Sequence, residues 1–112
     1  FKKFGFQFPR VISNNSFVSK NAFIGEGTIV FNHALINTGS VIGKNCIINN
    51  KSLIEHDSFI GDHVHISTSV TINGNCKIGQ NSFIGSRAVL KNDITIKKNS
   101  FVKMGTIIKK NL

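Results

Sequence analysis

Aliphatic side chains recur at every sixth position along almost the whole chain. Every sixth residue from Ile12 to Ile108 is Ile, Val or Leu, without a break. A period of six fits neither the 3.6-residue repeat of a helix nor the two-residue alternation of one long strand. It is typical of a hexapeptide solenoid, in which each unit forms one short strand and one turn. We therefore predict an all-β fold of stacked coils.

A second pattern lies four residues after each aliphatic residue, where most side chains are small. A side chain that points into a tight corner of a prism must be small, so three of the repeat units should form one triangular coil. The 112 residues then make one domain of about five to six coils. The inward corner positions are Ser16, Ala22, Thr28, Ala34, Ser40, Cys46, Ser52, Ser58, Val64, Val70, Cys76, Ser82, Ala88, Ile94, Ser100, Thr106 and Leu112.

The residue directly after each aliphatic residue is often Gly or Asn, as at Gly25, Asn37 and Gly61. These residue types tolerate positive φ, so we expect the turn to take positive φ at this position. Strong helix formers are sparse and the one proline is Pro9, so a helical alternative has little support.

The chain divides into two parts. Residues 1–11 stand outside the repeat and contain four phenylalanines and the proline, so we expect an N-terminal cap or a linker from a missing N-terminal domain. Residues 12–112 form the repeat domain without any insertion. Chemistry must therefore take place on the prism surface or between prisms.

The residue before each aliphatic residue should point outward, yet many of these residues are apolar. Contiguous apolar outer faces indicate burial against a partner, and two unlike apolar faces suit a head-to-tail ring, so we expect a homotrimer. The third face becomes more polar toward its C-terminal end. The first face carries Val11, Ile29, Ile47, His65, Phe83 and Phe101; the second Phe17, Leu35, Leu53, Thr71, Val89 and Ile107; the third Phe23, Val41, Phe59, Lys77 and Thr95.

The formal net charge of +9 raises the question of nucleic-acid binding. Seven cations crowd the last third of the chain against one acid, but no exposed aromatics are interleaved with them as base stacking requires, so nucleic acid is not expected. Solvated turn positions and a patch for the phosphates of a small anionic ligand both remain open. No apolar run approaches the ~20 residues of a membrane span and there is no charged-then-apolar leader, so we expect a cytoplasmic chain without membrane contact.

The two cysteines, Cys46 and Cys76, both occupy the small inward position, but at different places in the three-unit coil. They should therefore line different corners, too far apart for a disulfide. We interpret both as free, buried thiols of a reducing compartment.

Four histidines are the candidates for chemistry. A zinc site needs about three converging ligands, whereas His33, His56, His63 and His65 fall at four separate places in the coil, so no metal is expected. His56 lies between Glu55 and Asp57 in a turn. A neutral imidazole beside a carboxylate suits a general base, and a solvated turn histidine is the alternative; the residues alone leave both open.

The positions of His56 and His65 are half a coil apart, so one prism places them on different edges. If the two apolar faces pair across a trimer, His56 of one subunit approaches His65 of the next. The turn column Thr68, Ser86 and Met104 steps one coil at a time along the axis and could hold an extended pantetheine arm. Acyl transfer between two prisms would use this surface.

The segment from Ile48 to Ser67, with Glu-His-Asp at 55–57 and His-Ile-Ser at 65–67, resembles bacterial sugar acyltransferases of the sialic acid O-acetyltransferase and UDP-amino-sugar N-acetyltransferase type. The resemblance implies a left-handed parallel β-helix and a trimer with sites at the subunit interfaces. It implies His56 as general base with Asp57 as the partner that supports its basicity, contacts of His65, Ser86 and Met104 with acetyl-CoA, and Asn49 near the sugar.

The expected function is acetyl-CoA-dependent acetylation of a sugar or nucleotide-linked amino sugar in bacterial surface-glycan synthesis. The sequence leaves open whether oxygen or nitrogen is acetylated and which sugar is the acceptor. The family usually carries an N-terminal α/β domain, of which residues 4–9 resemble the exit segment. A non-catalytic solenoid scaffold that only binds partners is the alternative.

Overall fold

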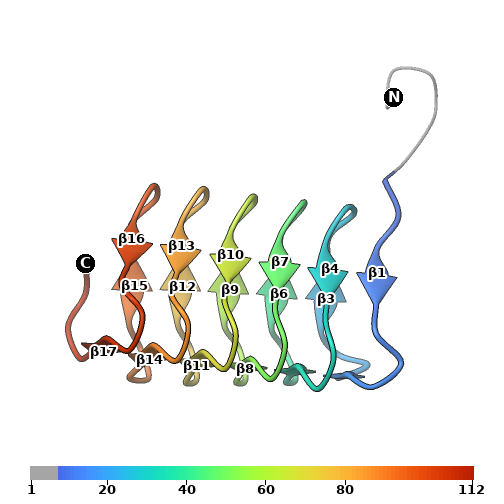
Figure 1. Ribbon diagram of the computed structural model, residues 1–112, viewed down its shortest axis with the longest axis horizontal. Helices are drawn as coiled ribbons and strands as arrows, with labels where there is room; N and C mark the ends of the chain where they lie inside the picture. Colours follow the sequence, from blue (N-terminus) through green and yellow to red (C-terminus); the bar gives the residue numbers. More distant parts are fainter. Residues whose placement is uncertain (1–7) are drawn as a thin grey trace.

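The computed structural model describes residues 8–112, which form a parallel β-solenoid (Figure 1). Seventeen strands of two residues each alternate with turns, and residues 8–112 contain no helix. Each strand ends on an aliphatic residue of the six-residue repeat. The predicted all-β solenoid is confirmed, and its form is consistent with the left-handed β-helix of hexapeptide repeats.

The strands stack into three parallel sheets, which we call sheets A, B and C. Sheet A contains β1 (Val11–Ile12), β4 (Ile29–Val30), β7 (Ile47–Ile48), β10 (His65–Ile66), β13 (Phe83–Ile84) and β16 (Phe101–Val102). Sheet B contains β2 (Phe17–Val18), β5 (Leu35–Ile36), β8 (Leu53–Ile54), β11 (Thr71–Ile72), β14 (Val89–Leu90) and β17 (Ile107–Ile108). Sheet C contains β3 (Phe23–Ile24), β6 (Val41–Ile42), β9 (Phe59–Ile60), β12 (Lys77–Ile78) and β15 (Thr95–Ile96). These sheets are the three predicted faces, residue for residue.

The strand register fixes one coil at three repeat units, because His65 pairs with Ile47 on one side and with Phe83 on the other. Backbone bonds join each coil to the next, as where Phe17 N donates to Ala34 O at 2.9 Å. Figure 1 shows the coils in a single row, with sheet B along the lower edge and sheet C behind sheet A. Each coil is therefore stabilised by its neighbours alone.

The core is a column of aliphatic side chains inside the prism. Ile42, Ile54 and Ile72 have no exposed surface, whereas Ile12 in the first coil is 40% exposed. The segment that precedes β1 is hydrogen-bonded to the first coil: Pro9 O accepts a hydrogen bond from Gly27 N at 3.1 Å. Of the predicted cap, residues 1–7 lie outside the described residues, and its last residue already belongs to β1.

The turn prediction was wrong about where φ becomes positive. Positive φ occurs at the third residue after the aliphatic, as at Asn45, Lys51 and Arg87. Glycine occurs directly after the aliphatic residue for another reason. A Cβ on Gly85 would lie 2.5 Å from Met104 N in the next coil. Close stacking of coils, rather than a left-handed backbone, therefore selects glycine there.

Both cysteines are free and buried, as predicted, and they line different corners. Cys46 lies between sheets C and A, and Cys76 between sheets B and C. Each thiol donates to a carbonyl of the next coil, Gly61 O and Lys91 O, at 3.1 Å in both cases. Burial raises the pKa of both thiols, so both stay protonated packing groups.

Within the described part of the chain, no helix has the length and apolar character needed to cross a membrane.

Candidate active site

His56 lies in the turn after β8, at the corner between sheets B and C. Its Nδ1 is 3.1 Å from Oδ2 of Asp57. An ionised carboxylate only accepts hydrogen bonds, so this contact favours the tautomer with the proton on Nδ1 and the lone pair on Nε2. The side chains are 58% and 64% exposed, so the pair adds little to stability and serves to orient the ring.

The imidazole borders an open groove of about 370 Å³ that continues into the next two coils. Its Nε2 faces Gly74, where an added Cβ would lie 2.5 Å away. Glu55 does not pair with His56, because its carboxylate accepts from Asn37 Nδ2 at 2.9 Å. The groove therefore presents a basic nitrogen among amides and carboxylates, which suits a ligand with hydroxyl or amino groups. It is lined by Glu55, His56, Asn73, Gly74, Asn75, Asn92 and Asp93.

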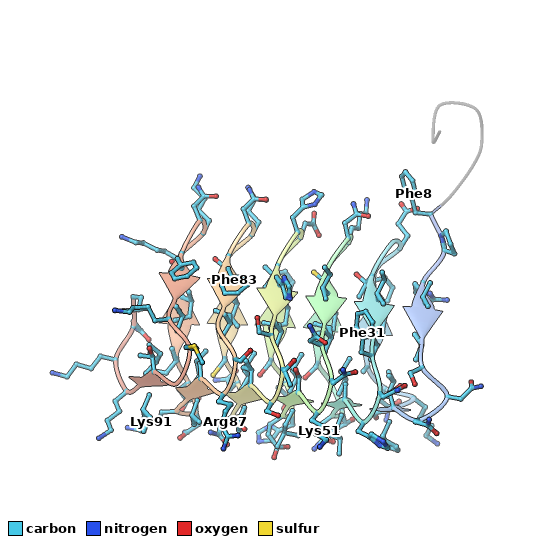
Figure 2. All side chains as sticks on the ribbon, viewed as in Figure 1. Phe8, Phe31, Lys51, Phe83, Arg87 and Lys91 are labelled. Atoms are coloured by element: carbon cyan, nitrogen blue, oxygen red, sulfur yellow. The ribbon has the colours of Figure 1, made fainter. Side chains whose placement is uncertain are left out.

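A second groove of about 390 Å³ lies at the C-terminal end of the same corner and shares Asn92 and Asp93 with the first. Three lysines line it, Lys91, Lys109 and Lys110. Figure 2 shows Lys91 at the lower edge of the molecule, where it projects from the coil. This concentration of charge beside the His56 groove favours the anionic-ligand interpretation of the basic C-terminal third.

His65 lies on sheet A, in β10. Its ring meets Phe83 edge-on, with centroids 5.1 Å apart, and Phe83 stacks on Phe101 at 5.2 Å. The Nε2 atom is buried and has no hydrogen-bond partner in residues 8–112. Burial lowers the pKa of His65, which keeps the ring neutral at neutral pH.

Asn49, Ser86 and Met104 all lie at the corner between sheets A and B, beside the sheet that carries His65. Ser86 is half-buried and Met104 is 74% exposed. The structure thus brings these three residues to one side of the prism and the His56–Asp57 pair to the next corner. Sheet B separates the two groups, so a single chain does not assemble all the predicted site residues around one groove.

His33 lies in a turn at the corner between sheets A and B, and His63 lies in a turn at the corner between sheets C and A; both have positive φ. Among residues 8–112, no group of three His, Cys, Asp or Glu side chains could hold a metal ion.

The sequence prediction missed the residues that line the groove beyond His56, above all Gly74 and Asn92. A signal was available, because these two residues occupy the same turn position as His56, one and two coils further along the chain. Reading each candidate together with its neighbours one coil away would have found them.

Residues 57–92 and 75–110 match the family model described as bacterial transferase hexapeptide (six repeats). The matched residues lie within the solenoid of six-residue units that the structure shows. This confirms the predicted repeat. A sequence comparison with curated proteins gives no match.

Two solved acetyltransferases share the fold at appreciable identity. The acetyltransferase domain of PglB from Neisseria gonorrhoeae, solved with acetyl coenzyme A, is 31% identical over 99% of this chain, with a TM-score of 0.97. PerB from Caulobacter crescentus, solved with CoA and GDP-perosamine, is 28% identical over 99% of this chain, with a TM-score of 0.96. This chain spans 54% of the length of each.

A hexapeptide transferase family protein from Anaplasma phagocytophilum is similar in fold alone, with 20% identity and a TM-score of 0.72 over 90% of this chain and 70% of that one.

Proposed function

We propose that the protein is an acetyl-CoA-dependent acetyltransferase whose acceptor is the amino group of a nucleotide-linked sugar. The observation that carries the proposal is the His56–Asp57 pair, whose free Nε2 faces a groove with polar walls. The likeness to two acetyltransferases, one solved with acetyl coenzyme A and one with CoA and GDP-perosamine, supports this choice of reaction. Cytoplasmic synthesis of a bacterial surface glycan is the setting we propose for it.

In the proposed reaction, the acceptor amine lies in the groove and its nitrogen attacks the thioester carbonyl. Nε2 of His56 takes the proton that the amine loses, while Asp57 accepts the Nδ1 hydrogen bond and supports the imidazolium. The carbon–sulfur bond then breaks, and the leaving thiolate takes a proton from the imidazolium. General-base help of this kind accelerates a reaction by ~10²–10⁴-fold.

The donor would lie between two subunits of a homotrimer. Sheet A carries the stack of Phe83 and Phe101, and sheet B carries Val89 and Ile107 at equivalent coils. Such apolar outer faces support burial against a neighbouring prism. In that arrangement sheet A of the neighbouring subunit lies beside the corner that holds His56.

His65, Ser86 and Met104 of the neighbouring subunit would then contact acetyl-CoA, and its Asn49 would lie near the sugar. The unpaired Nε2 of His65 supports this role, because a buried polar atom is stabilised when it gains a hydrogen-bond partner. The ring must turn for Nε2 to reach the thioester, since this atom is covered in the single chain.

The test is a thiol-release assay with acetyl-CoA and a panel of acceptors: UDP- and GDP-linked amino sugars, and sialic acid. We expect CoA release with at least one nucleotide-linked amino sugar and a product heavier by one acetyl group. A product that is stable to mild base indicates N-acetylation, and a base-labile product indicates O-acetylation. Release no faster than that of a His56→Ala variant with every acceptor would contradict the proposal.

A further inference from the structure

We propose that Gly39 and Gly74 are positioning residues for the His56–Asp57 pair, one in the coil before it and one in the coil after it. The inference rests on the proposed function, because it assigns the two glycines to the base of that reaction. Gly39 precedes Asp57 by one coil, and Gly74 follows His56 by one coil. The pair is therefore held between two positions that lack a side chain.

At Gly74 the reason for glycine is the imidazole itself. Gly74 does not have positive φ, so its backbone does not require glycine. An added Cβ would lie 2.5 Å from Nε2 of His56 and 2.6 Å from Cε1, closer than van der Waals contact allows. A methyl group here would push the ring aside or block the nitrogen that takes the proton.

At Gly39 the reason for glycine is the carboxylate of Asp57. The φ of +75° at Gly39 is not enough to select glycine, because Lys51 and Arg87 adopt positive φ at the equivalent position of other coils. A Cβ at Gly39 would overlap Oδ1 of Asp57. The empty position thus leaves room for the carboxylate that accepts the Nδ1 hydrogen bond.

The backbone cannot relieve either clash easily, because the pair is tied to both neighbouring coils. Asp57 N donates to Thr38 O at 3.0 Å, and His56 O accepts from Asn75 N at 2.9 Å. A methyl group at either glycine must therefore move a side chain of the pair. A displacement of about 1 Å in a catalytic group can cost ~10²-fold in rate.

Gly27 offers a matched control at the corner between sheets C and A. It also has φ of +75°, and a Cβ there would overlap the Asn45 side chain, which belongs to neither group of site residues. The Gly27→Ala variant carries the same backbone cost and the same kind of clash as Gly39→Ala. It does so without touching the His56–Asp57 pair.

The experiment compares Gly39→Ala, Gly74→Ala and Gly27→Ala in two measurements. The ¹⁵N chemical shifts of the His56 ring report the tautomer and the ring environment in the free protein. Thiol release gives kcat and KM. Thermal melts establish that each variant is folded.

We expect Gly74→Ala to retain the Nδ1–H tautomer but to shift the ring resonances and lower kcat by ~10²-fold. Gly39→Ala should mix the two tautomers of His56 and lower kcat by about tenfold. The imidazole is still present as the base, but the Asp57 carboxylate no longer orients it. KM for acetyl-CoA should stay within about twofold in both variants. Gly27→Ala should keep the wild-type tautomer and kcat, although its melting temperature falls as that of Gly39→Ala does.

Wild-type resonances of His56 in both Gly39→Ala and Gly74→Ala would overturn the inference, as would kcat values equal to that of Gly27→Ala. If the wild-type protein releases no thiol with any acceptor, the proposed function fails. The ¹⁵N measurement then still decides whether the two glycines hold the pair.

Discussion

The corner between sheets B and C and the corner between sheets A and B are built from the same six-residue unit, but they carry different chemistry. At the second residue after the aliphatic, the first corner holds His56, Gly74 and Asn92 in successive coils. The second corner holds Asn50, Thr68 and Ser86 at the same places. The backbone is the same at both corners, so the side chain at this turn position decides which corner has a base. The base can face a groove because the next coil has glycine, without a side chain, at the same position.

The two sides of the prism also carry different nitrogen atoms that could act in catalysis or binding. The His56 corner has an oriented imidazole, and the side of the prism formed by sheet A and the Ser86 corner has the unpaired nitrogen of His65. Sheet B separates them in one chain. Under the proposed function a complete site would require two chains, and the following experiments test that division of roles.

The largest expected effect is on assembly. Phe83→Asp places a charge on sheet A, within the stack of His65, Phe83 and Phe101. We expect trimers to become monomers and activity to disappear, because an unpaired charge cannot be buried at an apolar interface. Light scattering measures the number of chains per particle.

The control is Phe59→Asp on sheet C, where Phe59 is 48% exposed. This variant should remain trimeric, because sheet C is not part of the proposed interface. A wild-type protein that is monomeric at micromolar concentration would contradict both the interface and the shared site.

The second effect concerns the base alone. His56→Ala should lower kcat by ~10²–10⁴-fold and leave acetyl-CoA affinity nearly unchanged, because a general base acts in the transition state. His63→Ala removes another exposed turn histidine, at the corner between sheets C and A, and should keep wild-type kcat. Equal loss in both variants would mean that the His56 corner has no special role.

The fold could be predicted from the sequence because burial in a prism leaves one inward aliphatic position in every six. The same regularity gave all three outer faces correctly, including Lys77 and Thr95 on sheet C. The position of positive φ was not predictable from residue type. Asn and Gly serve two purposes in these turns, close stacking as at Gly85 and left-handed backbone as at Asn45, and composition does not separate them.

The candidate site was predicted only in part, for a different physical reason. His56 and Asp57 are adjacent in sequence, so their contact is local and could be expected. Gly74 depends on the coil register, which becomes certain only once the strands are paired. The proposed approach of His56 to His65 of a neighbouring subunit would depend on contacts between chains, which the pattern of one chain does not contain.

The third effect is a partial recovery of activity. His65→Ala should weaken acetyl-CoA binding by about tenfold, the loss of one hydrogen bond from a neutral ring. At acetyl-CoA concentrations well below KM, unfolding and refolding it together with His56→Ala should raise the activity above that of either variant, because about a quarter of the interfaces in an equal mixture receive both wild-type histidines. The mixture is compared with each variant refolded alone. If every site lay within one chain, the activity of the mixture would be only the average of the two variants refolded alone.

The smallest effect is on the pH dependence of stability, and it isolates the sheet A side of the comparison. Burial between Ile47 and Phe83 lowers the pKa of His65 from its ordinary value of 6.5. The unfolded chain therefore binds a proton at His65 more readily than the folded chain below pH 6.5. The free energy of unfolding should be unaffected by this group above pH 6.5 and should fall as the pH drops below that value.

His65→Gln removes the titration while it retains a polar side chain of similar size. Urea unfolding at pH 7.5 and pH 5.5, at one protein concentration, should show a larger loss of stability at the lower pH in the wild type than in His65→Gln. The exposed His63 provides the control substitution, His63→Gln, which is measured under the same conditions. An equal loss in all three proteins would show that the His65 ring is not desolvated. The sheet A side would then have no buried imidazole to offer to an acyl donor, and the comparison between the two corners would rest on His56 alone.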